Sequence, residues 1–136
     1  MKKIENKHVE RYFDPTNNLI YTKWFPSSGQ MSGEDYKNIL SESVDMIEKC
    51  RAVGLLTDAL DMRFAITPEL QNWTVNNVLP RIVAAGLLKQ AVILPELLIP
   101  QLAVEQVFEE IEAADTGYIS RFFCNIEEAK KWLGVK

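Results

Sequence analysis

The stretch of residues 51–68, RAVGLLTDALDMRFAITP, constrains the fold of this 136-residue chain more than any other stretch. Its first part, residues 53–57, is an apolar run that leads into Asp58. Such a run is typical of a strand buried on both faces, as in a parallel sheet between helices. Its second part is a polar loop that leads to a helix start at Thr67 and Pro68. The stretch therefore predicts one strand, loop and helix start of an α/β protein.

The segments on both sides of this stretch continue the alternation of strands and helices. Aromatic and β-branched runs at residues 9–13 and 19–25 surround a turn-forming stretch and predict an antiparallel hairpin. Further strands are predicted at residues 90–94 and 119–124, and helices after Ser32, over residues 67–86 with a kink at Pro80, from about Pro100, and from Asn125 to Gly134. We therefore predict one α/β domain over residues 1–136: an N-terminal β-hairpin, then successive β-α turns, with a five-stranded, mostly parallel sheet and four main helices.

Charge and composition narrow the classes of partner. The net charge is −4, from 15 basic and 19 acidic residues, which argues against a nucleic-acid-binding protein. Cys50 and Cys124 are too few for a disulfide framework or a metal knuckle and are typical of reduced cytoplasmic thiols. The N-terminus lacks the apolar run of a secretory signal, and prolines interrupt the longest apolar stretches. We expect a cytoplasmic protein without stable membrane insertion and without a nucleic-acid partner.

The loop after the central strand carries the charged side chains nearest to a catalytic arrangement. Asp58 and Asp61 could serve as an acid–base pair or bind a cation. Alternatively, Asp58 caps loop backbone and Asp61 pairs with Arg63. His8, the only histidine, is interpreted as a solvated residue of a polar N-terminal lead. We therefore predict no catalytic residue, no metal ligand and no cofactor, and expect that the protein is not an enzyme.

An apolar loop follows the next strand and ends at the same edge of the predicted sheet. Leu97, Leu98 and Ile99 stand between Pro95 and Pro100. Exposed apolar clusters tend to mark contact sites. Alternatively, these side chains fold down and cover the end of the sheet.

Two functions are compatible with this edge. The first is a non-enzymatic regulatory or interaction module that contacts a protein partner through the loops at residues 58–68 and 97–99. The alternative is a carrier or sensor of a small apolar, lipid-like ligand in a pocket at the carboxyl edge of the sheet. In that pocket Phe64, Trp73 and Leu97 would form the wall, and Asp58, Asp61 and Arg63 the polar anchors. A concave pocket of roughly 300 Å³ or more at this edge would favour the carrier.

Self-association is a further prediction from the hairpin. Its large side chains suit a covered surface better than an open edge, and bare edge strands invite pairing. We expect a homodimer through this edge, unless a terminus covers it. The side chains concerned are Tyr12, Phe13, Tyr21 and Trp24.

The chain resembles STAS domains of the anti-sigma-factor antagonist type, which have the SpoIIAA-like fold. The resemblance rests on the leading hairpin, the four β-α turns, the segment LLTDALD at residues 55–61 and the closing segment FCNIEEA at residues 123–129. Residues 73–80, and the ending from residue 121 to residue 133, look like the small stand-alone bacterial proteins grouped as STAS/SEC14-like. The resemblance implies a regulatory domain that binds a protein partner.

One position departs from the pattern of those antagonists. The family carries an Asp-Ser-Ser/Thr-Gly motif after the central strand, and a partner kinase phosphorylates its hydroxyl group. Here the matching residues are Ile66, Thr67, Pro68 and Glu69, so a hydroxyl remains without the leading Asp and the following Gly. Thr67 is explained as a helix N-cap, and phosphorylation of Thr67 is the alternative.

Overall fold

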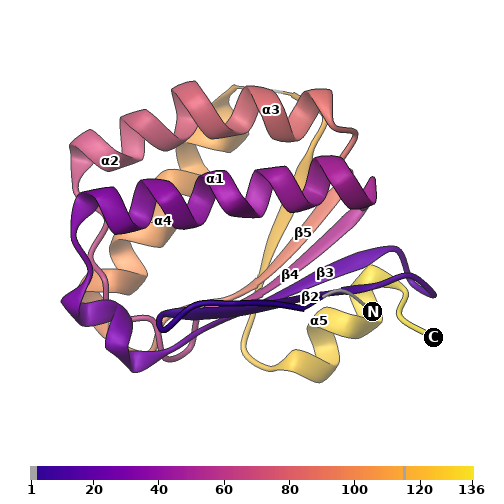
Figure 1. Cartoon of the computed structure of the whole chain (residues 1–136), viewed down its shortest axis with the longest axis horizontal. Coiled ribbons are helices and arrows are strands. Elements are labelled where there is room, and N and C mark those ends of the chain that lie inside the picture. The colour runs from indigo at the N-terminus through magenta and orange to yellow at the C-terminus, as the bar shows by residue number, and fades with distance from the viewer. Residues whose placement is uncertain (1–2, 115) are drawn as a thin grey trace.

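Six strands form one sheet in the computed structural model, which describes residues 3–114 and 116–136 (Figure 1). Their order in the sheet is their order along the chain. The strands are β1 (Lys3–Glu5), β2 (Val9–Asp14), β3 (Leu19–Trp24), β4 (Gly54–Asp58), β5 (Lys89–Ile93) and β6 (Ile119–Phe123). β1, β2 and β3 pair antiparallel, and β3 to β6 pair parallel. The predicted α/β class with a mostly parallel sheet is confirmed.

The predicted five strands are all present, and β1 is an additional short strand. It pairs with β2 along the side that the hairpin leaves open, with Lys3 opposite Tyr12 and Glu5 opposite Glu10. β2 is therefore not an edge strand, and a terminal strand covers it. Tyr21 and Trp24 are buried in the folded chain. The bare edge from which we expected a homodimer is thus already paired within the chain.

Helices cover both faces of the sheet unequally (Figure 1). The elements are η1 (Pro26–Gln30), α1 (Gly33–Cys50), α2 (Pro68–Trp73), η2 (Thr74–Val78), α3 (Leu79–Ala84), α4 (Leu98–Ala113) and α5 (Ile126–Leu133). α1, the continuous run α2–η2–α3, and α4 connect successive parallel strands and lie over one face. When every crossover is right-handed and each new strand is added at the same edge of the sheet, all the connecting helices lie on the same face of the sheet. α5 follows the last strand and covers the opposite face, next to β4, β5 and β6.

Local sequence signals set the starts of these helices. The Ser32 hydroxyl accepts the Asp35 N–H at 3.1 Å, and the Asp35 carboxylate accepts the Ser32 N–H at 3.0 Å. This reciprocal pair is a capping box, and Met31 and Tyr36 on either side of it are both buried, as a hydrophobic staple requires. Within the described chain, no helix combines the length and the apolar character needed to cross a membrane.

Pro80 produces a π-helical turn instead of a sharp kink. Pro80 has no N–H to give to the carbonyl four residues back, so the α-helical ladder is interrupted there. The chain inserts the wider turn η2, in which the Leu79 N–H donates to the Thr74 carbonyl oxygen. Two side chains donate hydrogen bonds to backbone carbonyl oxygens near this turn. The Thr74 hydroxyl donates to the Leu70 carbonyl oxygen at 2.8 Å, and the Asn77 amide donates to the Trp73 carbonyl oxygen at 3.0 Å. The helix therefore continues through the position of the predicted kink.

Side chains of different size pack on the two faces of the sheet. β4 confirms the prediction of a strand buried on both sides, because Leu55 packs under the larger helical layer and Leu56 packs with α5. Small residues lie on the face that α5 covers: Ala91 and Ala129 are wholly buried, and a Cβ atom at Gly54 would collide with Leu19 of β3. The helices on the other face carry larger side chains. A cavity remains between that helical layer and the sheet.

Candidate functional site

The two loops that the sequence assigned to one edge of the sheet lie side by side. The Glu96 N–H donates to the Leu60 carbonyl oxygen at 2.9 Å, and the Ala59 N–H donates to the Ile93 carbonyl oxygen at 3.0 Å. These bonds join the loop after β4 to the loop after β5. Parallel strands end at a common edge, so residues far apart in the chain meet there.

The two aspartates share one lysine instead of forming an acid–base pair. Lys23 Nζ lies 3.4 Å from Asp58 Oδ2 and 3.9 Å from Asp61 Oδ2. Asp58 also accepts the Leu60 N–H at 3.2 Å, as a loop-capping aspartate does. The predicted pairing of Asp61 with Arg63 is wrong, because β3 carries Lys23 to this position through its parallel register with β4. No group of three His, Cys, Asp or Glu side chains suited to a metal ion occurs among the residues described.

Arg63 contributes its backbone to the loop, whereas its side chain is exposed. The Arg63 N–H donates to the Ser28 hydroxyl at 2.9 Å, and Ser28 is wholly buried. The loop is thereby tied to η1, more than thirty residues earlier in the chain. Sequence reasoning assigned Ser28 to an ordinary turn, and no local pattern signals this long-range bond.

Phe64 and Trp73 pack around Tyr36 and do not form the wall of an edge pocket. The Phe64 ring stacks on Tyr36 with centroids 5.4 Å apart, and the Trp73 ring meets Tyr36 edge-on at 6.3 Å. The Lys37 ammonium group lies 5.7 Å from the centre of the Trp73 ring. Both aromatic residues are half-buried and extend the core beneath α1.

Thr67 is the N-cap of α2. Its hydroxyl oxygen accepts the Leu70 N–H at 3.3 Å, and Pro68 occupies the first helical position. Both details agree with the interpretation of Thr67 as a cap. Thr67 as a residue is exposed.

The apolar loop is exposed and extends further than predicted. Exposed fractions are 43% for Leu97 and 64% for both Leu98 and Ile99. Leu60, which is 44% exposed, belongs to the loop that Glu96 joins, and Leu102, 53% exposed, lies one helical turn after Leu98. We call these five residues the edge patch. Pro95 and Pro100 are buried and anchor its frame, so the alternative in which the loop folds down over the sheet is wrong.

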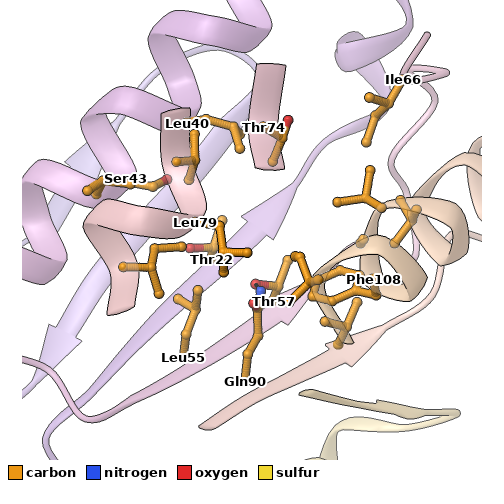
Figure 2. A pocket seen from close by; sticks show the side chains of 18 of the residues that line it. Thr22, Leu40, Ser43, Leu55, Thr57, Ile66, Thr74, Leu79, Gln90 and Phe108 are labelled. Carbon is orange, nitrogen blue, oxygen red and sulfur yellow. Dashed lines mark hydrogen bonds between the residues drawn. The ribbon is translucent and has the colours of Figure 1, made fainter. Parts of the chain in front are cut away.

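The cavity lies between the sheet and the helical layer, and the loop after β4 reaches it only at one end, through Ala59, Met62 and Ile66. It has a volume of about 130 Å³ and separates the sheet from the layer of α1, α2–η2–α3 and α4 (Figure 2). Sheet residues Thr22, Thr57 and Gln90 line one side, and Ser43, Thr74 and Phe108 line the helical side. None of the nine predicted site residues lines it. The predicted edge pocket of 300 Å³ is therefore not the concavity that the fold contains.

A wholly buried arginine supports the same helical layer. Arg11 Nη1 donates to Ser43 Oγ at 3.0 Å and to the Ile39 carbonyl oxygen at 3.3 Å, and Nη2 donates to Glu42 Oε2 at 3.0 Å. Desolvation lowers the pKa of Arg11, and Glu42 opposes that shift. Sequence reasoning missed Arg11, although the alternation of Val9, Arg11 and Phe13 along a strand places all three on one face.

His8 is buried, which corrects its interpretation as a solvated terminal residue. Its Nδ1 atom lies 3.1 Å from Ser27 Oγ, and the Ser27 hydroxyl donates to the Lys7 carbonyl oxygen at 2.6 Å. The Ser27 hydroxyl has one proton and donates it to the Lys7 carbonyl oxygen, so His8 Nδ1 is the donor to Ser27 Oγ. This arrangement is the reverse of a base that activates a serine.

Comparisons with protein-family models, with curated proteins and with solved structures found no match to this chain.

Proposed function

We propose that this protein is a non-enzymatic interaction module, similar in organisation to STAS domains, that binds a protein partner through the edge patch. The observation that carries the proposal is the exposure of five aliphatic side chains on two joined loops. Isolated exposed leucines are ordinary, whereas a cluster of them on one rigid edge is typical of contact surfaces. The leading hairpin and the successive β-α turns support the likeness to STAS domains.

The charges around the edge patch indicate the chemistry of the partner. Asp58, Asp61 and Glu96 belong to the two loops of the patch, and Lys23 and the exposed Arg63 supply two positive charges, so acidic side chains outnumber basic ones by one. A complementary surface would present apolar side chains at its centre and basic side chains at its rim. We propose a protein segment of this kind as the partner, because rim charges of opposite sign raise the rate of association.

The proposed mode of action is constitutive binding and not a phosphorylation switch. Thr67 already caps α2, and the residues around it lack the Asp and Gly of the switch motif. The chemistry at the edge also favours binding over catalysis. Asp58 and Asp61 are engaged by Lys23, and His8 is occupied by Ser27.

Site-specific photo-crosslinking in the native host tests the proposal. A photoreactive amino acid replaces Leu102 in the edge patch, and in the control protein it replaces Leu88, which is 59% exposed at the opposite end of β5. We expect one adduct of defined mass from position 102 and none from position 88. Equal adducts from both positions, or none from position 102, would contradict docking through the edge patch. An adduct between two copies of the chain would identify self-association as the function of this edge.

A further inference from the structure

The cavity combines apolar walls with a small polar floor. Thr22, Thr57 and Gln90 project into it from three adjacent strands (Figure 2). Gln90 Nε2 donates to Thr57 Oγ1 at 2.9 Å, and the Tyr118 hydroxyl donates to Gln90 Oε1. A parallel sheet between helices is ordinarily apolar at such positions. Apolar walls around a few convergent polar groups are the usual form of a small-molecule site.

The polar floor has hydrogen-bonding capacity that no residue in the described part of the chain uses. Gln90 has a second amide N–H, and Thr57 accepts from Gln90 and keeps its own proton to donate. On the opposite side, Ser43 accepts from Arg11 and likewise keeps its proton. These groups are donors, so the complementary feature of a ligand is an acceptor oxygen atom.

The cavity excludes charged ligands. Among the residues that the structure describes, its lining contains no Asp, Glu, Lys, Arg or His, and a bare charge in such surroundings would lose its hydration without compensation. Burial raises the pKa of Tyr36 to about 12 and also raises the pKa of Tyr118, so both ring hydroxyls stay neutral. The occupant must therefore be uncharged.

Size limits the occupant to a single ring. The volume is about 130 Å³. An apolar protein cavity of about 150 Å³ holds benzene, a single six-membered ring. A lipid with long acyl chains would not fit. Hydrogen bonds also hold the helical wall of the cavity in place. The Thr74 hydroxyl donates to the Leu70 carbonyl oxygen, so the Tyr36 hydroxyl donates to Thr74 Oγ1 at 2.8 Å.

We propose that this cavity binds a small, uncharged, monocyclic molecule that carries one hydroxyl or carbonyl oxygen, held by Gln90 and Thr57. The site is distinct from the edge patch, so this proposal does not rest on the proposed partner. The proposed site lies between the helical layer and the sheet, and not in a pocket at the carboxyl edge, where the sequence predicted a small-molecule site. The loop at residues 58–67 forms one end of it through Met62 and Ile66.

Phenol, benzene and benzoate are suitable probes, added to isotopically labelled protein and followed by two-dimensional NMR. Phenol should cause saturable shifts at the Gln90 side-chain amide and at the backbone of Thr57 and Val92. Benzene should also bind, but with a smaller shift at the Gln90 amide than phenol causes, because benzene offers no oxygen atom to that amide. Benzoate should not bind. Leu98→Asp, a change in the edge patch, should leave the phenol affinity unchanged.

Two variants separate the apolar and polar parts of the site. Val104→Phe places a larger side chain at the cavity wall and should abolish saturable shifts from both aromatic probes. Gln90→Met keeps the volume and should weaken phenol about tenfold relative to benzene. Thermal unfolding and the dispersion of the spectra show that each variant is folded.

Three results would overturn the proposal. The first is the absence of saturable shifts with either aromatic probe in the wild-type protein, which would mean that water alone occupies the cavity. The second is a set of shifts confined to the edge patch and lost in Leu98→Asp. The third is a ratio of phenol to benzene affinity that is the same in the wild type and in Gln90→Met, since the polar floor would then play no part. If Val104→Phe or Gln90→Met does not fold, the wild-type shifts and their response to Leu98→Asp still decide the first two outcomes, and the Gln90 amide shift with phenol against that with benzene replaces the third.

Discussion

The backbone N–H of Glu96 donates to the carbonyl oxygen of Leu60 at 2.9 Å. This bond turns two loops, separated by a helix and a strand in the sequence, into one surface. Leu60 and Leu97 are thereby neighbours of the same exposed edge, and α4 adds Leu98, Ile99 and Leu102. A change that loosens either loop should therefore disturb the whole edge patch.

A substitution of Ser28 tests whether the loop after β4 is held in place by its hydrogen bond to η1. Ser28→Ala removes the acceptor of the Arg63 N–H and should destabilise the protein by about 2 kcal/mol, the cost of an unpaired buried group. Hydrogen exchange should rise in residues 59–66. Gln30→Ala, at an exposed position of the same 3-10 turn, is the control and should leave both stability and exchange unchanged. Equal exchange in the two variants would show that Ser28 does not hold the loop.

Thr67 should act only as a helix cap. Thr67→Ala should cost about 1 kcal/mol of stability in urea unfolding, and Thr67→Ser should cost little, because serine keeps the oxygen that accepts the Leu70 N–H. Partner binding should be the same for both variants. The intact mass of protein purified from the native host should show no phosphate. A stoichiometric phosphate on Thr67 would contradict constitutive binding and indicate a kinase-controlled switch.

Glu42 should stabilise the fold through the buried Arg11. Glu42→Gln should cost about 1 kcal/mol, less than for a fully buried pair because the Glu42 side chain is half-exposed. The control, Glu34→Gln on the same helix, removes an exposed pair with Lys37 at 4.0 Å and one acidic charge in the first turn, and should cost only a few tenths of a kcal/mol. Chemical unfolding of the two variants at low salt measures the difference. Equal effects would mean that Arg11 gains nothing from Glu42.

The buried Tyr36 predicts a loss of stability in alkaline solution. Its pKa is about 12 in the folded protein and about 10 in an unfolded chain, so the folded state holds the proton more tightly. The contribution of Tyr36 is complete below about pH 10 and declines as the pH rises toward 12. Tyr36→Phe should therefore show a smaller fall in urea midpoint between pH 9 and pH 11 than the wild type. Identical falls would contradict the assignment to Tyr36.

Patterns within single elements predicted much of this fold. The apolar run before Asp58, the cap at Ser32 and the Thr67-Pro68 pair each depend on neighbours in the chain, and the structure has a strand or helix at each place. Parallel pairing then follows from the alternation of strands and helices, so the common edge of the loops was also predictable. β1 was missed because three residues, two of them charged, carry too little periodicity to indicate a strand.

Long-range relationships between side chains were not predictable from the same patterns. The Lys23 contact with Asp58 depends on the register between two strands, and the Ser28 contact with Arg63 depends on how a loop folds back. The cavity depends on the summed volumes of side chains from many elements and on the turn that Pro80 induces. A pocket was therefore expected at the edge, where Phe64 and Trp73 instead pack on Tyr36.

The most direct test of the edge patch is the affinity of the purified partner, once photo-crosslinking at position 102 has identified it. Calorimetric titrations would compare the wild-type protein with Leu98→Asp and with Leu88→Asp. Each variant replaces an exposed leucine by a charged residue. We predict that Leu98→Asp weakens binding at least a hundredfold, as burial of an unpaired charge in an interface requires, and that Leu88→Asp binds like the wild type. Wild-type affinity in Leu98→Asp would contradict the proposal that the edge patch is the binding surface.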